Sequence, residues 1–98
     1  MNEQAREALV SASLQGVRQI RGIFWNGKGG YCALGVLAKS LGLEGSRIEP
    51  WYKTEHGAEL SQERLQCPAC NFMGVESLVI SHMNDDHEFD FLTIARKL

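Results

Sequence analysis

Two cysteines and two histidines near the end of the chain have the spacing of a tetrahedral metal site. Cys67 and Cys70 are separated by two residues, and after eleven more come His82 and His87, with four residues between them. Two thiolates and two imidazoles satisfy the fourfold coordination that Zn²⁺ prefers, and a two-residue gap lets a tight turn aim both sulfurs at one point. Protein ligands then fill all four positions and leave none for a catalytic water. The spacing therefore predicts a structural zinc site.

The same four residues have a second interpretation. In a reducing cytosol, Cys67 and Cys70 could form a redox pair, with both histidines as ordinary surface residues. A thioredoxin-like pair should open a helix after a buried strand, whereas residues 60–66, ahead of Cys67, are mostly polar. This difference favours zinc.

The segment between the histidines predicts how they reach one metal. Residues five apart on a continuous helix lie about 140° apart around its axis, so the helix must loosen or end between them. Asn84 can stop the helix, and a carboxylate of Asp85 or Asp86 can accept a hydrogen bond from a ligand imidazole and fix its tautomer. Alternatively, Asp85, Asp86, Glu88 and Asp90 form an acidic patch that meets a basic partner. We predict the first role for one aspartate and the second for the rest.

Size and composition make a metal useful to this chain. With 98 residues, 44% of them hydrophobic, the chain should form one domain whose core alone gives marginal stability. We expect the last third to be loose without zinc. No stretch approaches the roughly 18 apolar residues of a membrane span, and residues 1–7 are polar rather than signal-like. The chain has three cysteines, and two of them are assigned to the metal site. This use of cysteine fits a reducing cytoplasm, where disulfides are rare.

Hydrophobic periodicity predicts a mainly α fold, with a small α+β arrangement as the alternative, in which N-terminal helices pack on a C-terminal zinc-finger-like module. We expect an amphipathic helix over residues 3–21, a turn over residues 25–30 and a buried helix over residues 31–41 that Gly42 ends in the left-handed conformation. A last helix should start near Asp90, with a buried stripe of Phe91, Ile94, Ala95 and Leu98.

The chain from residue 43 to residue 66 has an irregular pattern. Pro50, Trp51 and Tyr52 indicate an ordered connection, and residues 59–65 a short helix. The expected organisation is a single domain over residues 1–98, with a helical part at 1–45, a connection at 46–66 and a zinc-binding module at 67–98.

Sequence-specific DNA reading is not expected of this module. Alignment with a ββα zinc finger puts Met73 and Val79 on its core positions. The positions that would read bases carry Val75, Ser77, Leu78 and Ser81. None of these is an Arg, Lys, Asn or Gln that could make a bidentate pair with a base edge.

A glycine-rich loop is the second place that could bind a ligand. The loop Gly27-Lys28-Gly29-Gly30 lies just before a predicted helix, where free amides and the charge of Lys28 could hold an anion. Trp25 and Tyr31 flank the loop and could stack on a nucleotide base. The P-loop spacing is absent, and glycine-rich segments usually only connect elements. The pattern favours a plain turn.

Cys32 offers a third kind of chemistry. At a helix start its thiolate would be stabilised, and pairing with His56 would give a nucleophile for a hydrolase or transferase. Its position in an almost wholly apolar run favours a buried thiol instead. The sequence therefore leaves enzymatic activity uncertain and favours its absence.

Two segments resemble a known group. Gly30–Leu37 is similar to the "CALGAL" segment, and Ile80–His87 with Ile94 and Ala95 is similar to the "HLNDxH…IAxxL" segment, of small uncharacterised proteins of bacteriophages and bacterial genomes. Some members also carry Cys-Pro-x-Cys, which matches Cys67–Cys70. The resemblance implies a phage-type accessory protein in the host cytoplasm. We therefore expect docking on a host protein first, capture of a small anionic ligand such as a nucleotide second, and a Cys32 enzyme third.

Overall fold

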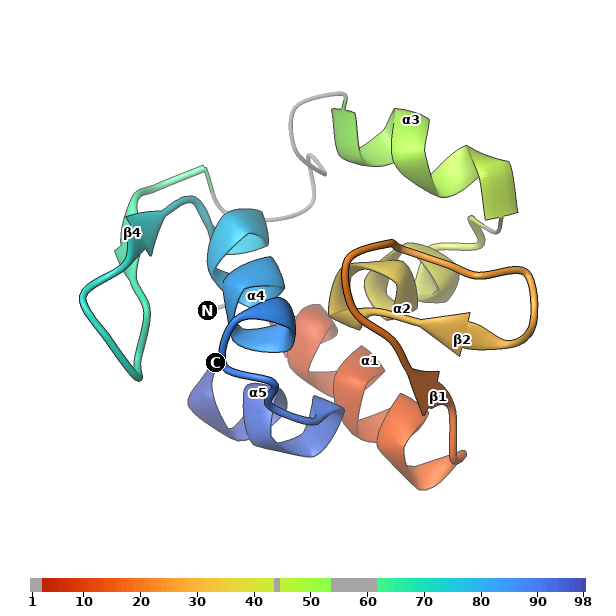
Figure 1. The fold of residues 1–98 in the computed structure, drawn as a ribbon, viewed down its shortest axis with the longest axis horizontal. Helices are drawn as coiled ribbons and strands as arrows, with labels where there is room; N and C mark the ends of the chain where they lie inside the picture. Colours follow the sequence, from red (N-terminus) through yellow and green to blue (C-terminus); the bar gives the residue numbers. More distant parts are fainter. Residues whose placement is uncertain (1–2, 44, 54–61) are drawn as a thin grey trace.

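A computed structural model describes residues 3–43, 45–53 and 62–98. The described chain is mostly helical, with two small sheets, so the mainly α prediction is confirmed (Figure 1). In chain order the elements are α1 (Glu3–Leu14), β1 (Arg18–Gln19), β2 (Gly30–Tyr31), α2 (Ala33–Ser40), the 3₁₀ turn η1 (Gly45–Arg47), α3 (Ile48–Lys53), β3 (Leu65–Gln66), β4 (Met73–Gly74), α4 (Glu76–Asp85) and α5 (Phe91–Lys97).

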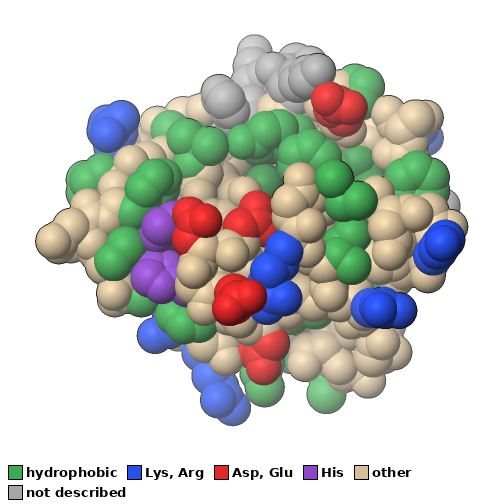
Figure 2. Space-filling model, viewed as in Figure 1, with side chains coloured by type: hydrophobic (Ala, Val, Ile, Leu, Met, Phe, Trp, Pro, Cys, Tyr) green, Lys and Arg blue, Asp and Glu red, His purple; other side chains and the backbone are tan. Residues whose placement is uncertain are grey.

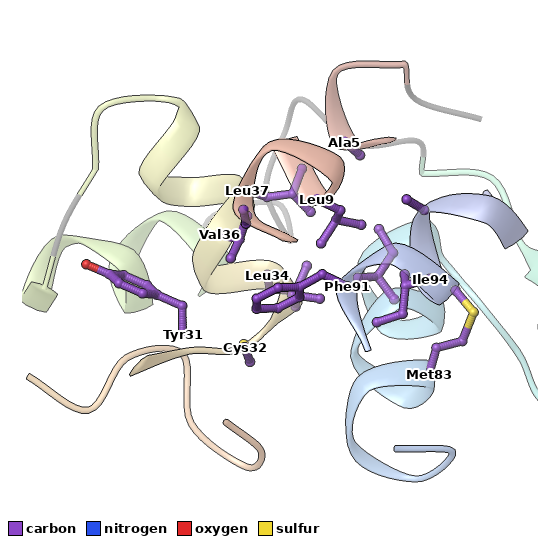
Figure 3. Close-up of a cluster of buried hydrophobic side chains, with 14 of the residues drawn as sticks. Ala5, Leu9, Tyr31, Cys32, Leu34, Val36, Leu37, Met83, Phe91 and Ile94 are labelled. Atoms are coloured by element: carbon purple, nitrogen blue, oxygen red, sulfur yellow. The ribbon is translucent and has the colours of Figure 1, made fainter. Parts of the chain in front are cut away.

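The core lies where helices from both ends of the sequence meet. Helix α1 packs on α5 and α2, and α2 also packs on α4. The side chains of Leu9, Leu34, Phe91 and Ile94 point toward one another at the centre of this cluster (Figure 3), and all four are buried. Burying one such side chain stabilises the fold by about 1.5–3 kcal/mol.

Helix α1 is shorter than the predicted helix over residues 3–21. It ends at Leu14 because Gly16 takes a left-handed φ of 71°. The amide of Gly16 donates to the Ser13 carbonyl and that of Val17 to the Ala12 carbonyl, which is a Schellman end. The chain then turns away to form β1, which pairs in parallel with β2.

Helix α2 starts at Ala33, later than predicted, because residues 30 and 31 form β2. Residues 33–38 are all buried, which confirms a helix covered on several sides. A side chain at Gly35 would collide with the Phe24 carbonyl oxygen, so this position requires glycine. The predicted end at Gly42 is confirmed, because Gly42 has a φ of 85° and the Leu43 amide donates to the Ala38 carbonyl.

The predicted connection over residues 46–66 contains more regular structure than its pattern suggests. Pro50 lies in the first turn of α3, where the missing amide proton costs no hydrogen bond. The Tyr52 ring contacts Phe24, with ring centroids 4.9 Å apart. The predicted helix at 59–65 is wrong over residues 62–65, because residues 62–64 are not helical and Leu65 begins β3. Residues 59–61 of that prediction lie outside the described ranges.

The last helix forms as predicted. The Asp90 carboxylate accepts a 2.8 Å hydrogen bond from the Thr93 amide and caps α5. Phe91, Ile94 and Ala95 are buried, whereas Leu98 is only partly covered. Nowhere in residues 3–43, 45–53 or 62–98 is a helix both long and apolar enough to cross a membrane.

Candidate metal centre

The two cysteines lie on the tight turn of a β-hairpin. Strands β3 and β4 pair antiparallel, with Gln66 opposite Met73. The Cys67 amide donates to the Phe72 carbonyl at 2.8 Å and the Cys70 amide to the Cys67 carbonyl at 3.4 Å, so the backbone folds back on itself between the strands. This turn brings both sulfurs to the same side. Cys67 is 2% exposed, and Cys70 is partly exposed.

The two histidines come from the end of α4 and the residues just beyond it. His82 lies in the helix, which ends at Asp85, and His87 follows the helix. The amides of Asp86 and His87 both donate to the His82 carbonyl, which closes the last turn. The prediction that the helix ends between the histidines is therefore confirmed. Figure 2 shows histidine side chains together on the left part of the visible face, between hydrophobic and acidic ones.

The four predicted ligands converge. One ligand atom from each of Cys67, Cys70, His82 and His87 lies within 4.8 Å of the others, and we call this set the four-ligand cluster. The Cys70 sulfur is 3.2 Å from Nε2 of His82 and 3.4 Å from Nε2 of His87. At bond lengths of about 2.3 Å for Zn–S and about 2.05 Å for Zn–N, a tetrahedral ion holds sulfur and nitrogen ligands about 3.5 Å apart. The cluster therefore fits a metal ion.

Local hydrogen bonds prepare these groups for a cation. The pKa of Cys70 falls from its ordinary 9.0 to about 6, because the Phe72 amide and then the imidazoles of His82 and His87 stabilise the thiolate. Burial alone would lower the pKa of His82, but its contacts with Cys70 and Asp86 outweigh burial and raise it. Metal ions bind thiolates rather than thiols, so a ready thiolate favours ligation.

Neighbouring side chains orient the two imidazoles. Asp86 lies 2.8 Å from Nδ1 of His82, which leaves Nε2 to face Cys70. The Phe72 ring stacks on His82 at a centroid distance of 4.2 Å, and the Phe89 ring stacks on His87 at 5.0 Å. The predicted ligand-orienting aspartate is thus Asp86.

The remaining acidic residues also make contacts within the fold. The Asp85 carboxylate accepts hydrogen bonds from the Gly22 amide and from Asn84, and Asp90 caps α5. Glu88 lies 3.8 Å from Arg21. Asp85 and Asp90 thus make contacts within the fold, and an acidic surface for a basic partner stays a prediction.

Asn84 has a role that its sequence position does not reveal. The prediction that it stops the helix is wrong, because α4 continues to Asp85. Its side chain is completely buried and makes four hydrogen bonds. The oxygen accepts from Gln19 Nε2 at 2.7 Å and the Ala33 amide at 3.0 Å, and the nitrogen donates to the Ile20 carbonyl at 3.0 Å and Asp85 Oδ1 at 2.7 Å. One buried amide thus joins α4, the segment after β1 and the start of α2.

The finger-like alignment is correct at one core position and wrong at the other. Val79 is fully buried, but Met73 is 45% exposed. Of the base-reading positions, Ser77 is buried, Leu78 is 38% exposed, and Val75 and Ser81 are partly covered. A buried Ser77 cannot contact a nucleic acid, which adds to the lack of base-pairing side chains at these positions.

The glycine-rich loop lies apart from the four-ligand cluster, on β2 and the turn before it. Asn26 Oδ1 accepts from the amides of Lys28 at 2.8 Å and Gly30 at 2.9 Å. Trp25 forms a β-bridge with Tyr31, which is 7% exposed and has the Lys39 ammonium 4.9 Å from its ring centroid. Of the expected ligand residues, Trp25, Lys28 and Gly29 remain at the surface, whereas Gly30 and Tyr31 are buried. The loop has fewer free donors for an anion than its sequence indicates.

Cys32 is buried at the start of α2. Its sulfur accepts from the Gly35 amide at 3.4 Å, and burial raises the pKa of its thiol. A protonated thiol is a poor nucleophile. His56, its expected partner, lies outside the described residues.

Comparison with known proteins gives no relative for this arrangement. No protein-family model, curated protein or solved structure matches the chain.

Proposed function

We propose that this chain is a zinc-stabilised binding protein in which the four-ligand cluster holds one structural Zn²⁺. The convergence of Cys67, Cys70, His82 and His87 from a hairpin and a helix end is the observation that supports it. Two thiolates favour a soft or borderline ion over Mg²⁺ or Ca²⁺, and two imidazoles beside them suit zinc. The order β3–β4–α4, with sulfur ligands on the hairpin turn and histidines at the helix end, is that of a ββα zinc finger.

The ion would stabilise the whole domain rather than one hairpin. On α4, Val79, Ile80 and Met83 are each fully buried in the common core. A metal that fixes the C-terminal end of α4 therefore also fixes a helix on which α2 and α5 pack. Structural zinc contributes on the order of 10 kcal/mol in small fingers, which is comparable with the total stability of a domain of this size.

We infer that the zinc-bearing domain acts by docking on a protein. Next to the cluster, Phe72, Met73 and Leu78 are 36%, 45% and 38% exposed. Phe72 and Leu78 both lie beside Gly74, where an added Cβ would be 3.3 Å from the first and 3.2 Å from the second. Grouped apolar side chains of this kind favour a protein partner over a nucleic acid. A host protein bound by a phage-type accessory protein, as the sequence resemblance implies, is the partner that we propose.

Metal analysis of matched cysteine variants tests the site. We expect one zinc per chain in the purified protein and in Cys32→Ser, and none in Cys67→Ser, by elemental analysis and native mass spectrometry. Both variants remove a buried thiol, but only one removes a proposed ligand. Co²⁺ should give the visible bands of a tetrahedral site with thiolate ligands. A metal-free wild type, or full metal content in Cys67→Ser, would contradict the proposal.

A further inference from the structure

The segment that follows β1 is fastened to the same end of α4 that carries the histidines. Six hydrogen bonds join residues 19–22 to residues 84–89. Gln19 Nε2 donates to Asn84 Oδ1 and to the Phe89 carbonyl, both at 2.7 Å. Arg21 donates to the carbonyls of Asn84 and Glu88, both at 3.1 Å. The Gly22 amide donates to Asp85 Oδ1 at 3.2 Å, and Asn84 Nδ2 donates to the Ile20 carbonyl at 3.0 Å. Three of the acceptors are backbone carbonyls of residues 84–89, so they are available only while these residues keep their conformation.

That conformation includes a residue in an unfavourable state. Glu88 has a φ of 57°, a left-handed value that residues with side chains rarely adopt. It directly follows His87, and Asp86 on the other side of His87 contacts His82. A metal bound to both histidines would fix the chain on the N-terminal side of Glu88. Without the metal, one of the constraints that keep Glu88 left-handed is lost.

On its other side, the fastened segment leads into an apolar groove. Ile23 and Trp25 are 55% and 39% exposed, and with Phe24 and Ile48 they line a groove of about 400 Å³. The Trp25 ring lies against the turn at η1, where an added Cβ on Gly45 would be 3.3 Å from it. The position of residues 22–25 therefore determines whether this groove is formed.

We propose that metal occupancy of the four-ligand cluster controls the conformation of residues 22–25 and thereby the shape of this groove. The inference rests on the proposed zinc site. With the metal bound, residues 84–89 present their acceptors to Gln19 and Arg21, and the groove is formed. When the metal leaves, Glu88 relaxes, these acceptors move, and residues 22–25 lose the attachment to residues 84–89 that Gln19, Arg21 and Gly22 provide.

Trp25 reports on this loop directly. The chain has two tryptophans, so Trp51→Phe leaves Trp25 as the sole emitter. We would strip this protein of metal with a chelator, titrate it with Zn²⁺, and follow Trp25 emission and its quenching by acrylamide. The expected result is a change in emission that saturates at one Zn²⁺ per chain, with quenching at least twofold weaker in the zinc-bound form. A parallel Co²⁺ titration shows independently that the site is loaded.

Two variants separate the coupling from metal binding. Arg21→Ala removes two of the anchoring hydrogen bonds and no ligand, so it should bind Co²⁺ with unchanged bands while the Trp25 response falls at least threefold. Arg18→Ala is the matched control, because its side chain makes no recorded hydrogen bond with any described residue. In Glu88→Gly the left-handed conformation costs little, because glycine adopts it readily. This variant should keep residues 22–25 in place without metal, so its Trp25 emission should change less on Zn²⁺ addition.

The outcomes distinguish this inference from the zinc site itself. A Trp25 signal that stays constant while the cobalt bands show full loading would overturn the coupling and leave the metal site intact. An undiminished response in Arg21→Ala would do the same. Absence of the cobalt bands would overturn both the site and the inference that depends on it.

Discussion

Replacing Asn84 with alanine tests whether one buried amide holds three segments together. The Ala33 amide would be left buried without its acceptor, which costs about 1–3 kcal/mol. The other three hydrogen bonds join partners that water can partly reach, and each contributes about 0.5–1.5 kcal/mol. Alanine has a higher helix propensity than asparagine, which offsets up to about 0.7 kcal/mol of this loss. The free energy of unfolding should therefore fall by about 2–7 kcal/mol.

Urea unfolding at saturating Zn²⁺, followed by far-UV circular dichroism, measures this loss. A domain of this size has a total stability of about 5–15 kcal/mol, and each kcal/mol corresponds to about 4–8 °C in Tm. We therefore expect the Tm in a thermal scan of the same signal to fall by at least about 8 °C. Ser81→Ala, on the same helix, is the control, because the Ser81 hydroxyl makes no recorded hydrogen bond with any described residue. If Asn84→Ala loses less than about 1 kcal/mol, or no more than Ser81→Ala, Asn84 does not hold these segments together.

Three further predictions concern α2 and α5. Gly35→Ala should destabilise the fold by about 1–3 kcal/mol in urea unfolding, because the new methyl group collides with the Phe24 carbonyl; a stabilised variant would show that the two segments can separate. Asp90→Ala should cost about 0.5–2 kcal/mol through the lost cap of α5, and Asp90→Asn should recover most of it. Hydrogen bonds with Thr93 lower the pKa of Asp90, so its stabilising effect is full above the ordinary value of 3.8 and is lost as the pH falls through the folded value; the difference between wild type and Asp90→Ala should therefore shrink in acid. Burial raises the pKa of Cys32, so the thiol form stabilises the fold below the ordinary value of 9.0, and this contribution is lost as the pH rises through the folded value. Peptide mapping after iodoacetamide treatment at pH 8 should find Cys32 unmodified until urea is added, and rapid labelling of the folded protein would contradict its burial.

Signals confined to a few neighbouring residues predict this structure well. The spacing of the four ligands, the cap at Asp90 and the helix end at Gly42 all depend on short-range geometry, and the structure contains each of them. The end of α1 carries the same glycine signal at Gly16. Periodicity alone nevertheless predicts a longer helix, because Val17 and Ile20 continue the apolar stripe. A glycine that ends a helix therefore outweighs apolar residues beyond it.

Contacts between distant segments could not be predicted from the sequence. Asn84 is read as a helix terminator because asparagine favours turns, but three of its four partners lie 51 to 65 positions away. Likewise, nothing near Asp85 in the sequence indicates that its carboxylate will accept a hydrogen bond from the Gly22 amide. From the sequence alone, Pro50 suggests a connection between helices. In the structure it lies in the first turn of α3, where proline is well tolerated.

The pairing of α1 with α5 affects how the protein is made. The ribosome produces Leu9 about 80 residues before Phe91 and Ile94, against which it is buried. At a synthesis rate of about 5–20 residues per second, the surface of α1 that packs on α5 stays uncovered for about 4–16 s. During translation this helix is therefore an exposed hydrophobic segment that chaperones can bind, and the core closes only when α5 leaves the ribosome.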